Sequence, residues 1–376
     1  MSLVLQEKLN HEQALYVARA FEDYFGDFNK IDEYMREQKL NSLADLPFSL
    51  PGCGPEEDLF SDFNIHPNDM DFELVELDSA RWQRYLDIIS SHNNLSSPGR
   101  NVRLAVLEKK TQKWVGFIRI GSPTIMMKPR NELLDCVITN ETETTKSFNK
   151  AAAMGFVIVP AQPFGYNYLG GKLLAAICCS HEVRKKLDEK YGMNTCLFET
   201  TSLYGTSKAV SQYDGMKPFL RFGGTTESDF LPMMHGKPYD DLKNYVEGIV
   251  GVFVPEDASS RKLKISNTII SMTKVALKNH KEDYESFMNT INKAKGLTEK
   301  KRYYYCNYGI DNYKDIVLGK ADNYVVGENY EKHNLSNIID WWKKKAANRY
   351  DSLKSEGRLR TEIEVWTSGK PIDIIR

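Results

Sequence analysis

Between Met154 and Lys172 the chain reads MGFVIVPAQPFGYNYLGGK, and this segment sets the expected architecture. Residues 155–160 are a continuous apolar run of the kind that forms a buried strand. Residues 162–168 contain turn-forming residues, and a helix is predicted to open at residues 169–172. A strand that leads through a glycine-bearing loop into a helix start leaves backbone N–H groups free, and such groups bind anions.

A second buried strand is predicted at residues 196–205, where the run Cys-Leu-Phe-Glu-Thr-Thr-Ser-Leu-Tyr-Gly ends in polar residues. The helix between the two strands is predicted from Leu169 to about Tyr191. Gly192 follows it at the position where a left-handed residue commonly ends a helix. We therefore expect a functional pocket where these two strands end.

The flanking segments extend this unit into one mixed sheet. Alternating apolar residues on both sides of a polar tip predict a β-hairpin over residues 102–120. One sheet with a single principal crossover helix accounts for the order of the elements. The remaining predictions are helices at 8–39, 80–91, 260–300 and 337–353, helical or irregular structure at 128–150, a connection at 46–68, and strands at 219–222 and 303–305. The expected fold class is α+β, a mixed sheet flanked by helices.

Charge is unevenly distributed along the 376 residues. Residues 1–75 carry 16 Asp and Glu against 5 Lys and Arg, whereas residues 260–376 carry 23 Lys and Arg against 15 Asp and Glu. This pattern is compatible with a basic body that meets a polyanion and an acidic head that stays clear of it. It is equally compatible with two solvated surfaces that bind nothing. At this length we expect two domains, or one domain with substantial additions.

No apolar run approaches the roughly 20 residues that a membrane-spanning helix needs, and the N-terminal residues lack a signal pattern. The protein is therefore expected to be cytoplasmic and to have no membrane partner. The six cysteines lack Cys-x-x-Cys spacing and are expected to be reduced, mostly buried thiols. The seven histidines supply no pair at ligand spacing, so no metal site is expected.

The loop and helix start after the first strand are the candidate site for an anionic donor. Such a donor would be held through Gln162, Gly165, Gly170, Gly171 and Lys172, because glycines allow close backbone approach and the helix presents its positive end. A pyrophosphate, phosphodiester or carboxylate would fit this description. Alternatively, Gly170 and Gly171 only let the helix pack tightly on its sheet.

The end of the second strand and the segment after it supply the candidate catalytic side chains, which are Glu199, Thr201, Ser202, Tyr204, Tyr213 and Arg221. Glu199 could act as a general base if burial raises its pKa. Tyr213 could protonate a leaving group, and Arg221 could neutralise a phosphate or carboxylate. Alternatively, Glu199 is paired with Arg221 or Lys217 and is purely structural.

The C-terminal region combines Trp341 and Trp342 with many basic side chains. Interleaved aromatic and basic residues suit base stacking and phosphate contacts. The candidates for nucleic-acid binding are Lys343, Lys344, Lys345, Arg349, Arg358 and Arg360. Two adjacent tryptophans cannot share one helix face, so at least one is expected in the core. A solvated basic face without a ligand is the alternative.

Several of these motifs together resemble the DruA family of Druantia anti-phage systems, whose members are similar to the GNAT superfamily of N-acetyltransferase-like proteins. The resemblance covers roughly residues 80–230. It rests on the hairpin end at 115–123, the strand 156–160, the helix start at 168–174, the segment 198–205 and residues 221–225.

This resemblance implies a GNAT-like sheet, a function in phage biology, and an acyl or aminoacyl donor held by the loop. Pro163 and Tyr166–Leu169 interrupt the usual Arg/Gln-x-x-Gly-x-Gly/Ala run, which argues against acetyl-CoA. The phage Mom DNA-modification protein is similar in fold and acts on nucleic acid with an unusual donor. The partner implied here is nucleic acid, with DNA as its expected form, and further protein subunits are compatible with a defence system.

The resulting hypothesis divides the chain into three regions. These are an acidic helical region and linker at 1–75, a GNAT-like core at 76–255, and a basic, mainly helical region at 256–376. The leading function is a GNAT-like nucleic-acid-modifying transferase. The alternative is a catalytically inactive DNA-binding or complex-forming subunit on the same fold.

Overall fold

The computed structural model describes residues 8–29, 31–43, 55–91, 99–139, 142–202, 211–226, 233–258, 261–297 and 300–366. The chain divides into two compact units that alternate along the sequence. The smaller unit comprises residues 1–45 and 228–299, and the larger comprises residues 46–227 and 300–374. Residues 228–299 thus group with the N-terminal residues, and the chain returns to the larger unit at residue 300.

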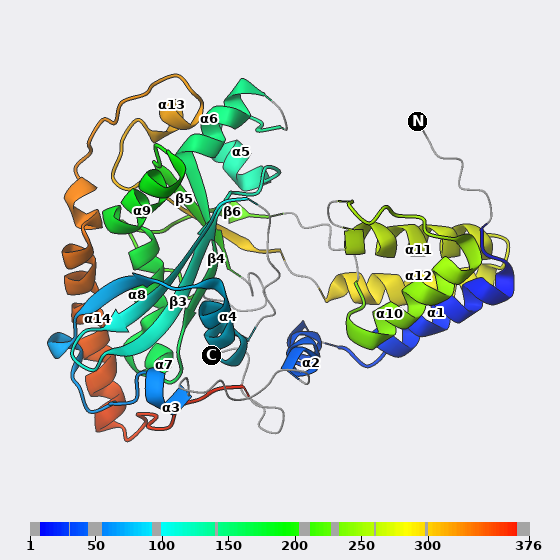
Figure 1. The fold of residues 1–376 in the computed structure, drawn as a ribbon, viewed down its shortest axis with the longest axis horizontal. Coiled ribbons are helices and arrows are strands. Elements are labelled where there is room, and N and C mark those ends of the chain that lie inside the picture. The colour runs from blue at the N-terminus through cyan, green and yellow to red at the C-terminus, as the bar shows by residue number, and fades with distance from the viewer. Residues whose placement is uncertain are drawn as a thin grey trace. The chain divides into compact units, whose positions relative to one another are not determined.

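The larger unit contains a seven-stranded mixed sheet in the order β1-β2-β3-β4-β5-β7-β6 (Figure 1). The strands are β1 (Phe72–Glu76), β2 (Asn101–Glu108), β3 (Lys113–Gly121), β4 (Ala152–Pro160), β5 (Leu197–Thr201), β6 (Arg221–Thr225) and β7 (Arg302–Cys306). β4 and β5 are parallel, and every other neighbouring pair is antiparallel. The predicted α+β class, the hairpin and the mixed sheet are therefore confirmed.

Helices cover both faces of this sheet. α8 packs on β3 and β4, α14 packs on α7 and α8, and α4 packs on β2 and β4 within a separate apolar cluster. The helical elements of the larger unit are α3 (Pro55–Asp58), η1 (Pro67–Asp69), α4 (Ser79–Ile89), α5 (Lys128–Leu134), α6 (Glu143–Ala151), α7 (Phe164–Tyr168), α8 (Gly170–Cys178), α9 (His181–Tyr191), α13 (Tyr313–Val317), η2 (Tyr330–His333) and α14 (Leu335–Ser355).

The crossover from β4 to β5 differs from the single helix that was predicted. The first helix ends at Cys178. Ser180 then starts a second helix, because its side chain accepts a hydrogen bond from the backbone N–H of Val183. Serine is among the residues that best cap a helix in this way. The crossover ends as predicted at Gly192, which has a φ of 61°.

The smaller unit is helical in its described residues. It contains α1 (His11–Phe25), α2 (Ile31–Leu43), α10 (Gly236–Val250), α11 (Arg261–Leu277) and α12 (Lys281–Gly296). α1 packs on α10, α11 and α12. The single helices predicted over 8–39 and 260–300 are each two helices in the structure. Within the described parts of the chain, no helix has both the length and the apolar character that crossing a membrane requires.

Candidate functional site

β4 and β5 are parallel neighbours in the sheet, but β4 extends beyond the end of β5. Their parallel pairing runs from Ala152 with Leu197 to Gly155 with Thr200. β4 then continues for five residues to Pro160, and over that stretch it pairs with β3. The pairing of the two strands therefore ends at Gly155, five residues before β4 itself ends at Pro160.

The glycines after β4 serve the packing of the loop. A Cβ atom on Gly165 would lie 2.5 Å from the Gln162 Nε2 atom, and one on Gly170 would lie 2.7 Å from the Phe164 ring. A Cβ atom on Gly171 would lie 2.6 Å from the side-chain oxygen of Gln212. Neighbouring atoms thus occupy the space that a donor would need beside Gly165 and Gly170. This geometry favours the packing alternative over the anion cradle.

The remaining candidate of that loop, Lys172, already has a partner. Its Nζ atom donates a hydrogen bond of 2.6 Å to the carbonyl oxygen of Asp214. Burial lowers the pKa of Lys172, and the nearby positive charge of Lys345 lowers it further. The charge of Lys172 therefore lies close to the basic residues of α14.

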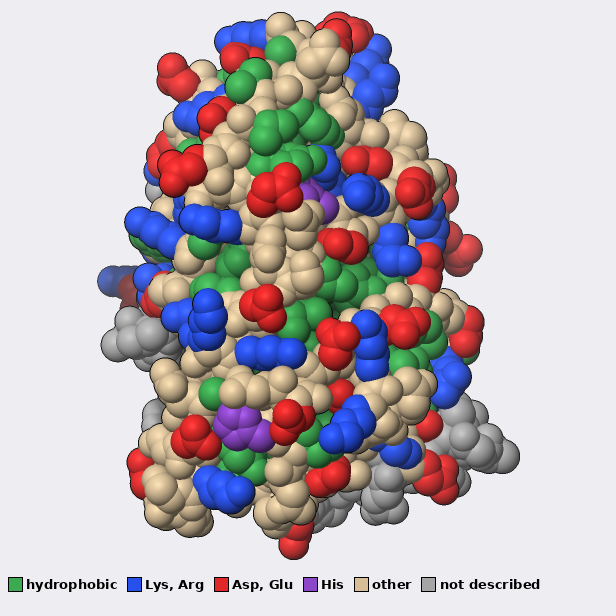
Figure 2. Space-filling model, turned by 90° about the vertical axis from the view of Figure 1, so that its left-hand side faces the viewer, with side chains coloured by type: hydrophobic (Ala, Val, Ile, Leu, Met, Phe, Trp, Pro, Cys, Tyr) green, Lys and Arg blue, Asp and Glu red, His purple; other side chains and the backbone are tan. Residues whose placement is uncertain are grey.

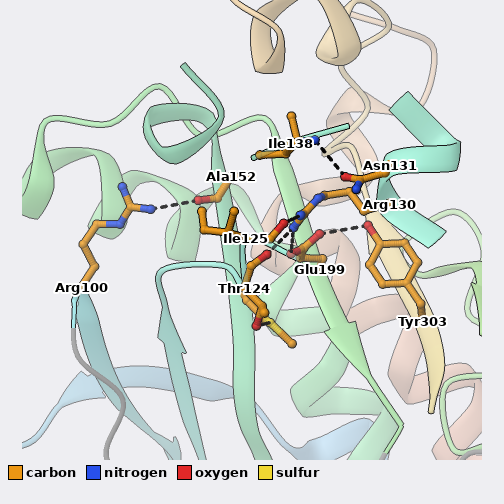
Figure 3. A network of polar contacts seen from close by, with 10 residues as sticks. Arg100, Thr124, Ile125, Arg130, Asn131, Ile138, Ala152, Glu199 and Tyr303 are labelled. Carbon is orange, nitrogen blue, oxygen red and sulfur yellow. Dashed lines mark hydrogen bonds and ion pairs between the residues drawn. The ribbon is translucent and has the colours of Figure 1, made fainter. Parts of the chain in front are cut away.

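Glu199 lies at the centre of a sealed polar network (Figure 3). Its side chain is 0% exposed, and its two oxygens accept hydrogen bonds of 3.0 Å each from Arg130 Nη1 and Tyr303 OH. Arg130 is equally buried and also donates to the carbonyl oxygens of Thr124 and Ile125. Burial raises the pKa of Glu199, whereas the Arg130 charge and the Tyr303 hydroxyl lower it.

This burial disfavours the role of general base proposed for Glu199. A general base must reach the proton that it removes, directly or through one water molecule. Here both carboxylate oxygens are satisfied by protein groups inside the core. The structural alternative fits, but the partner is Arg130 and not Arg221 or Lys217. No spacing rule links residues 130 and 199, so the sequence could not identify this pair.

The other catalytic candidates that the structure describes have partners of their own. Ser202 is buried, and its backbone N–H donates to the carbonyl oxygen of Arg302. Tyr213 is also buried, with its ring edge-to-face on Tyr304, and burial raises its pKa. Arg221 lies on β6, with β7 between it and Glu199, so about 10 Å of sheet separates the two backbones. Thr201 is partly buried, and Tyr204 lies outside the described residues.

Three arginines converge on Tyr166, which belongs to α7. The Arg360 and Arg349 guanidinium groups lie 4.1 and 4.8 Å from the centre of the Tyr166 ring. Arg358 Nη2 lies 3.4 Å from the Tyr166 hydroxyl. We call these four residues the Tyr166 arginine cluster. Sequence analysis identified the three arginines as candidates but not the tyrosine that assembles them.

The segment after α14 is held against the loop that follows β4. The Asn167 side chain donates to the carbonyl oxygen of Arg360 at 2.7 Å and accepts from the Arg360 N–H at 3.1 Å. Glu364 N–H donates to the carbonyl oxygen of Gln162 at 3.0 Å. The two segments are almost 200 residues apart in sequence, yet together they build the Tyr166 arginine cluster.

The three consecutive lysines of α14 face solvent to different degrees. Lys344 and Lys345 are exposed and Lys343 is half-buried, while Trp342 is buried as predicted for one tryptophan of the pair. Lys345 Nζ lies 5.4 Å from the centre of the Trp341 ring. Figure 2 shows the side on which α14 lies in Figure 1, and Lys and Arg side chains there alternate with Asp and Glu. The positive charge is therefore local and not a continuous basic face.

Comparison with known proteins gives one match. Residues 62–215 match the family model described as Druantia protein DruA. These residues include β1 to β5 and the loop that carries Tyr166. No curated protein and no solved structure matches the chain.

Proposed function

The chain belongs to the DruA-like family through its residues 62–215, and from this premise we propose that it is a nucleic-acid-binding component of an anti-phage defence system. The contact surface is the Tyr166 arginine cluster together with the exposed Lys344 and Lys345 of α14. Glu199 has a structural role in this proposal. The observation that carries it is the convergence of three guanidinium groups on one partly exposed tyrosine.

The chemistry of the cluster suits a phosphate backbone. Guanidinium groups bind phosphate in a bidentate manner, and here the Tyr166 ring holds two of them close together. Arg358 and Arg360 are paired with Glu356 and Glu364 at 2.6 and 3.1 Å. Exposed ion pairs contribute little free energy, so phosphates could replace these carboxylates at small cost.

Removal of the cluster's positive charges should weaken binding to duplex DNA. For the triple variant Arg349→Ala, Arg358→Ala, Arg360→Ala we expect a loss of at least about tenfold in affinity, measured by fluorescence anisotropy between about 50 and 200 mM salt. The slope of log K against log salt should fall by about 0.9 for each phosphate that the variant no longer neutralises. This change in slope distinguishes weaker phosphate binding from a smaller amount of folded protein.

A charge-matched control lies on the β2–β3 hairpin. Lys109→Ala, Lys110→Ala, Lys113→Ala removes the same number of charges from a different surface of the same unit. We expect this variant to bind as the unmodified chain does. Equal reductions of affinity in the two triple variants would mean that binding responds only to net charge, and the cluster would then have no special role.

A GNAT-like nucleic-acid-modifying transferase is the second candidate. The strand–loop–helix segment that follows β4, the parallel neighbour of β5, favours it, because backbone N–H groups at a helix start can bind an anionic donor. The donor would be an acyl or aminoacyl carrier, and the base would be a group other than Glu199. Mass spectrometry of phage and host nucleosides, with and without the chain, tests it. A new modified nucleoside would establish the transferase, and unchanged nucleosides together with cluster-dependent binding would support the first proposal.

A further inference from the structure

Two histidines and an aspartate meet in the smaller unit. His11 opens α1, His280 precedes α12, and Asp283 lies in the first turn of α12. One possible ligand atom from each residue lies within 4.8 Å of the other two, and this is the one such group among the residues that the structure describes. His11 Nε2 is 2.8 Å from Asp283 Oδ2, and the two imidazole rings are stacked at 3.6 Å with 12° between their planes.

The packing of α1 on α12 explains why these residues meet. The two helices run in the same direction, because His11 contacts Asp283 at one end and Lys293 Nζ donates to the carbonyl oxygen of Gly26 at the other. Phe21 packs edge-to-face on Phe287 between these contacts. Parallel packing brings two positive helix N-termini together, and the first turns carry acidic residues that offset this charge, namely Glu12, Glu282 and Asp283.

We propose that His11, His280 and Asp283 bind a divalent transition-metal ion of the Zn²⁺ class. Imidazole and carboxylate ligands suit Zn²⁺ and its neighbours, whereas Mg²⁺ and Ca²⁺ take oxygen ligands. Tetrahedral Zn²⁺ with bonds of about 2.0–2.1 Å separates its ligand atoms by about 3.3–3.4 Å. The two ring centres are 3.6 Å apart, and because each lone pair lies in its ring plane, both imidazoles must rotate out of the stack to direct a nitrogen at one ion.

Three protein ligands leave a fourth position for water or another group. His11 and Asp283 are about one-third exposed and His280 is exposed, so an ion can reach the site from solvent. The ion would join the starts of α1 and α12 and stabilise the smaller unit by mass action. The sequence predicted no metal site because His11 and His280 lie far apart in the chain and no local spacing reveals them.

The test measures binding of Zn²⁺ alone to the full chain, by competition with a chromophoric chelator. We expect one Zn²⁺ per chain and a loss of about 10- to 100-fold or more in affinity for His280→Ala, since even the removal of an outer-shell partner costs that much. Co²⁺ in place of Zn²⁺ should give visible absorption bands in the unmodified chain and not in the variant. Zn²⁺ should also raise the melting temperature of the unmodified chain and not that of His280→Ala.

His66→Ala is the matched control. His66 lies 3.5 Å from Asp351 and so also belongs to a histidine–aspartate pair, but it has no second imidazole in that pair. We expect its affinity for Zn²⁺ to equal that of the unmodified chain. Asp283→Asn keeps the size of the side chain and should lose affinity as His280→Ala does. The proposal is overturned if the unmodified chain binds no Zn²⁺, or if His280→Ala binds it as tightly as His66→Ala does.

Discussion

Replacing Glu199 with alanine should lower the free energy of unfolding by about 3–5 kcal/mol. The change leaves the Arg130 guanidinium charged, fully buried and without its carboxylate partner, and it removes the acceptor of the Tyr303 hydroxyl. Burial of an uncompensated charge is among the most destabilising results of a single substitution. Chemical denaturation followed by circular dichroism measures the effect.

The double variant Arg130→Met, Glu199→Leu provides the control. Replacing both members of a buried ion pair by apolar residues is often neutral or stabilising, so most of the stability should return. The same variants test the structural assignment of Glu199. If Glu199→Ala abolishes protection of cells against phage while its unfolding free energy stays unchanged, the carboxylate takes part in chemistry and the structural assignment is wrong.

Replacing Trp342 with alanine should cost about 3–5 kcal/mol, as is typical for a fully buried tryptophan. Trp342 is 0% exposed, its ring lies 5.1 Å from that of Phe72, and its Nε1 atom donates to the carbonyl oxygen of Tyr168 at 2.8 Å. The substitution removes the side chain that holds α14 against α7. DNA affinity should therefore fall with stability, because Arg349 and Tyr166 lie on these two helices. Denaturation and anisotropy measure the two effects.

Trp341 is the natural comparison for this prediction. It is partly exposed and touches Phe219 at its ring edge, so Trp341→Ala should cost clearly less. Equal reductions of stability in the two variants would contradict the assignment of Trp342 as the tryptophan that anchors α14.

Most of the sheet could be predicted because its signals are local. The hairpin of β2 and β3 alternates around a polar tip, and the apolar runs of β4 and β5 flank a crossover that ends at Gly192. β1 is not predicted from the sequence. Its residues, Phe72–Glu76, form only a short alternating run, and such runs also occur in loops. Helix breaks were missed where one capping side chain, such as that of Ser180, decides the outcome.

The candidate site was less predictable because its decisive contacts join distant parts of the chain. Glu199 is a catalytic candidate from the sequence, but its partners Arg130 and Tyr303 lie 69 and 104 residues away. Glycines after a strand occur both in loops that bind anions and in loops that only pack tightly against a helix or sheet. Only the neighbours of Gly165 and Gly170 distinguish the two cases. The bounds of the compact units could not be predicted from the sequence either. Composition gives no sign that the chain leaves one unit and later returns to it.

The antiparallel pairing of β6 with β7 has a consequence for how the protein could be dissected. Thr225 lies opposite Arg302, so the segment that belongs to the other unit departs from and rejoins the sheet at neighbouring positions. Two adjacent antiparallel strands can be joined by a turn of two residues. The helices between these strands, α10 to α12, have the topology of an insertion in a hairpin, and they pack with α1, which joins the same unit from the N-terminal part of the chain.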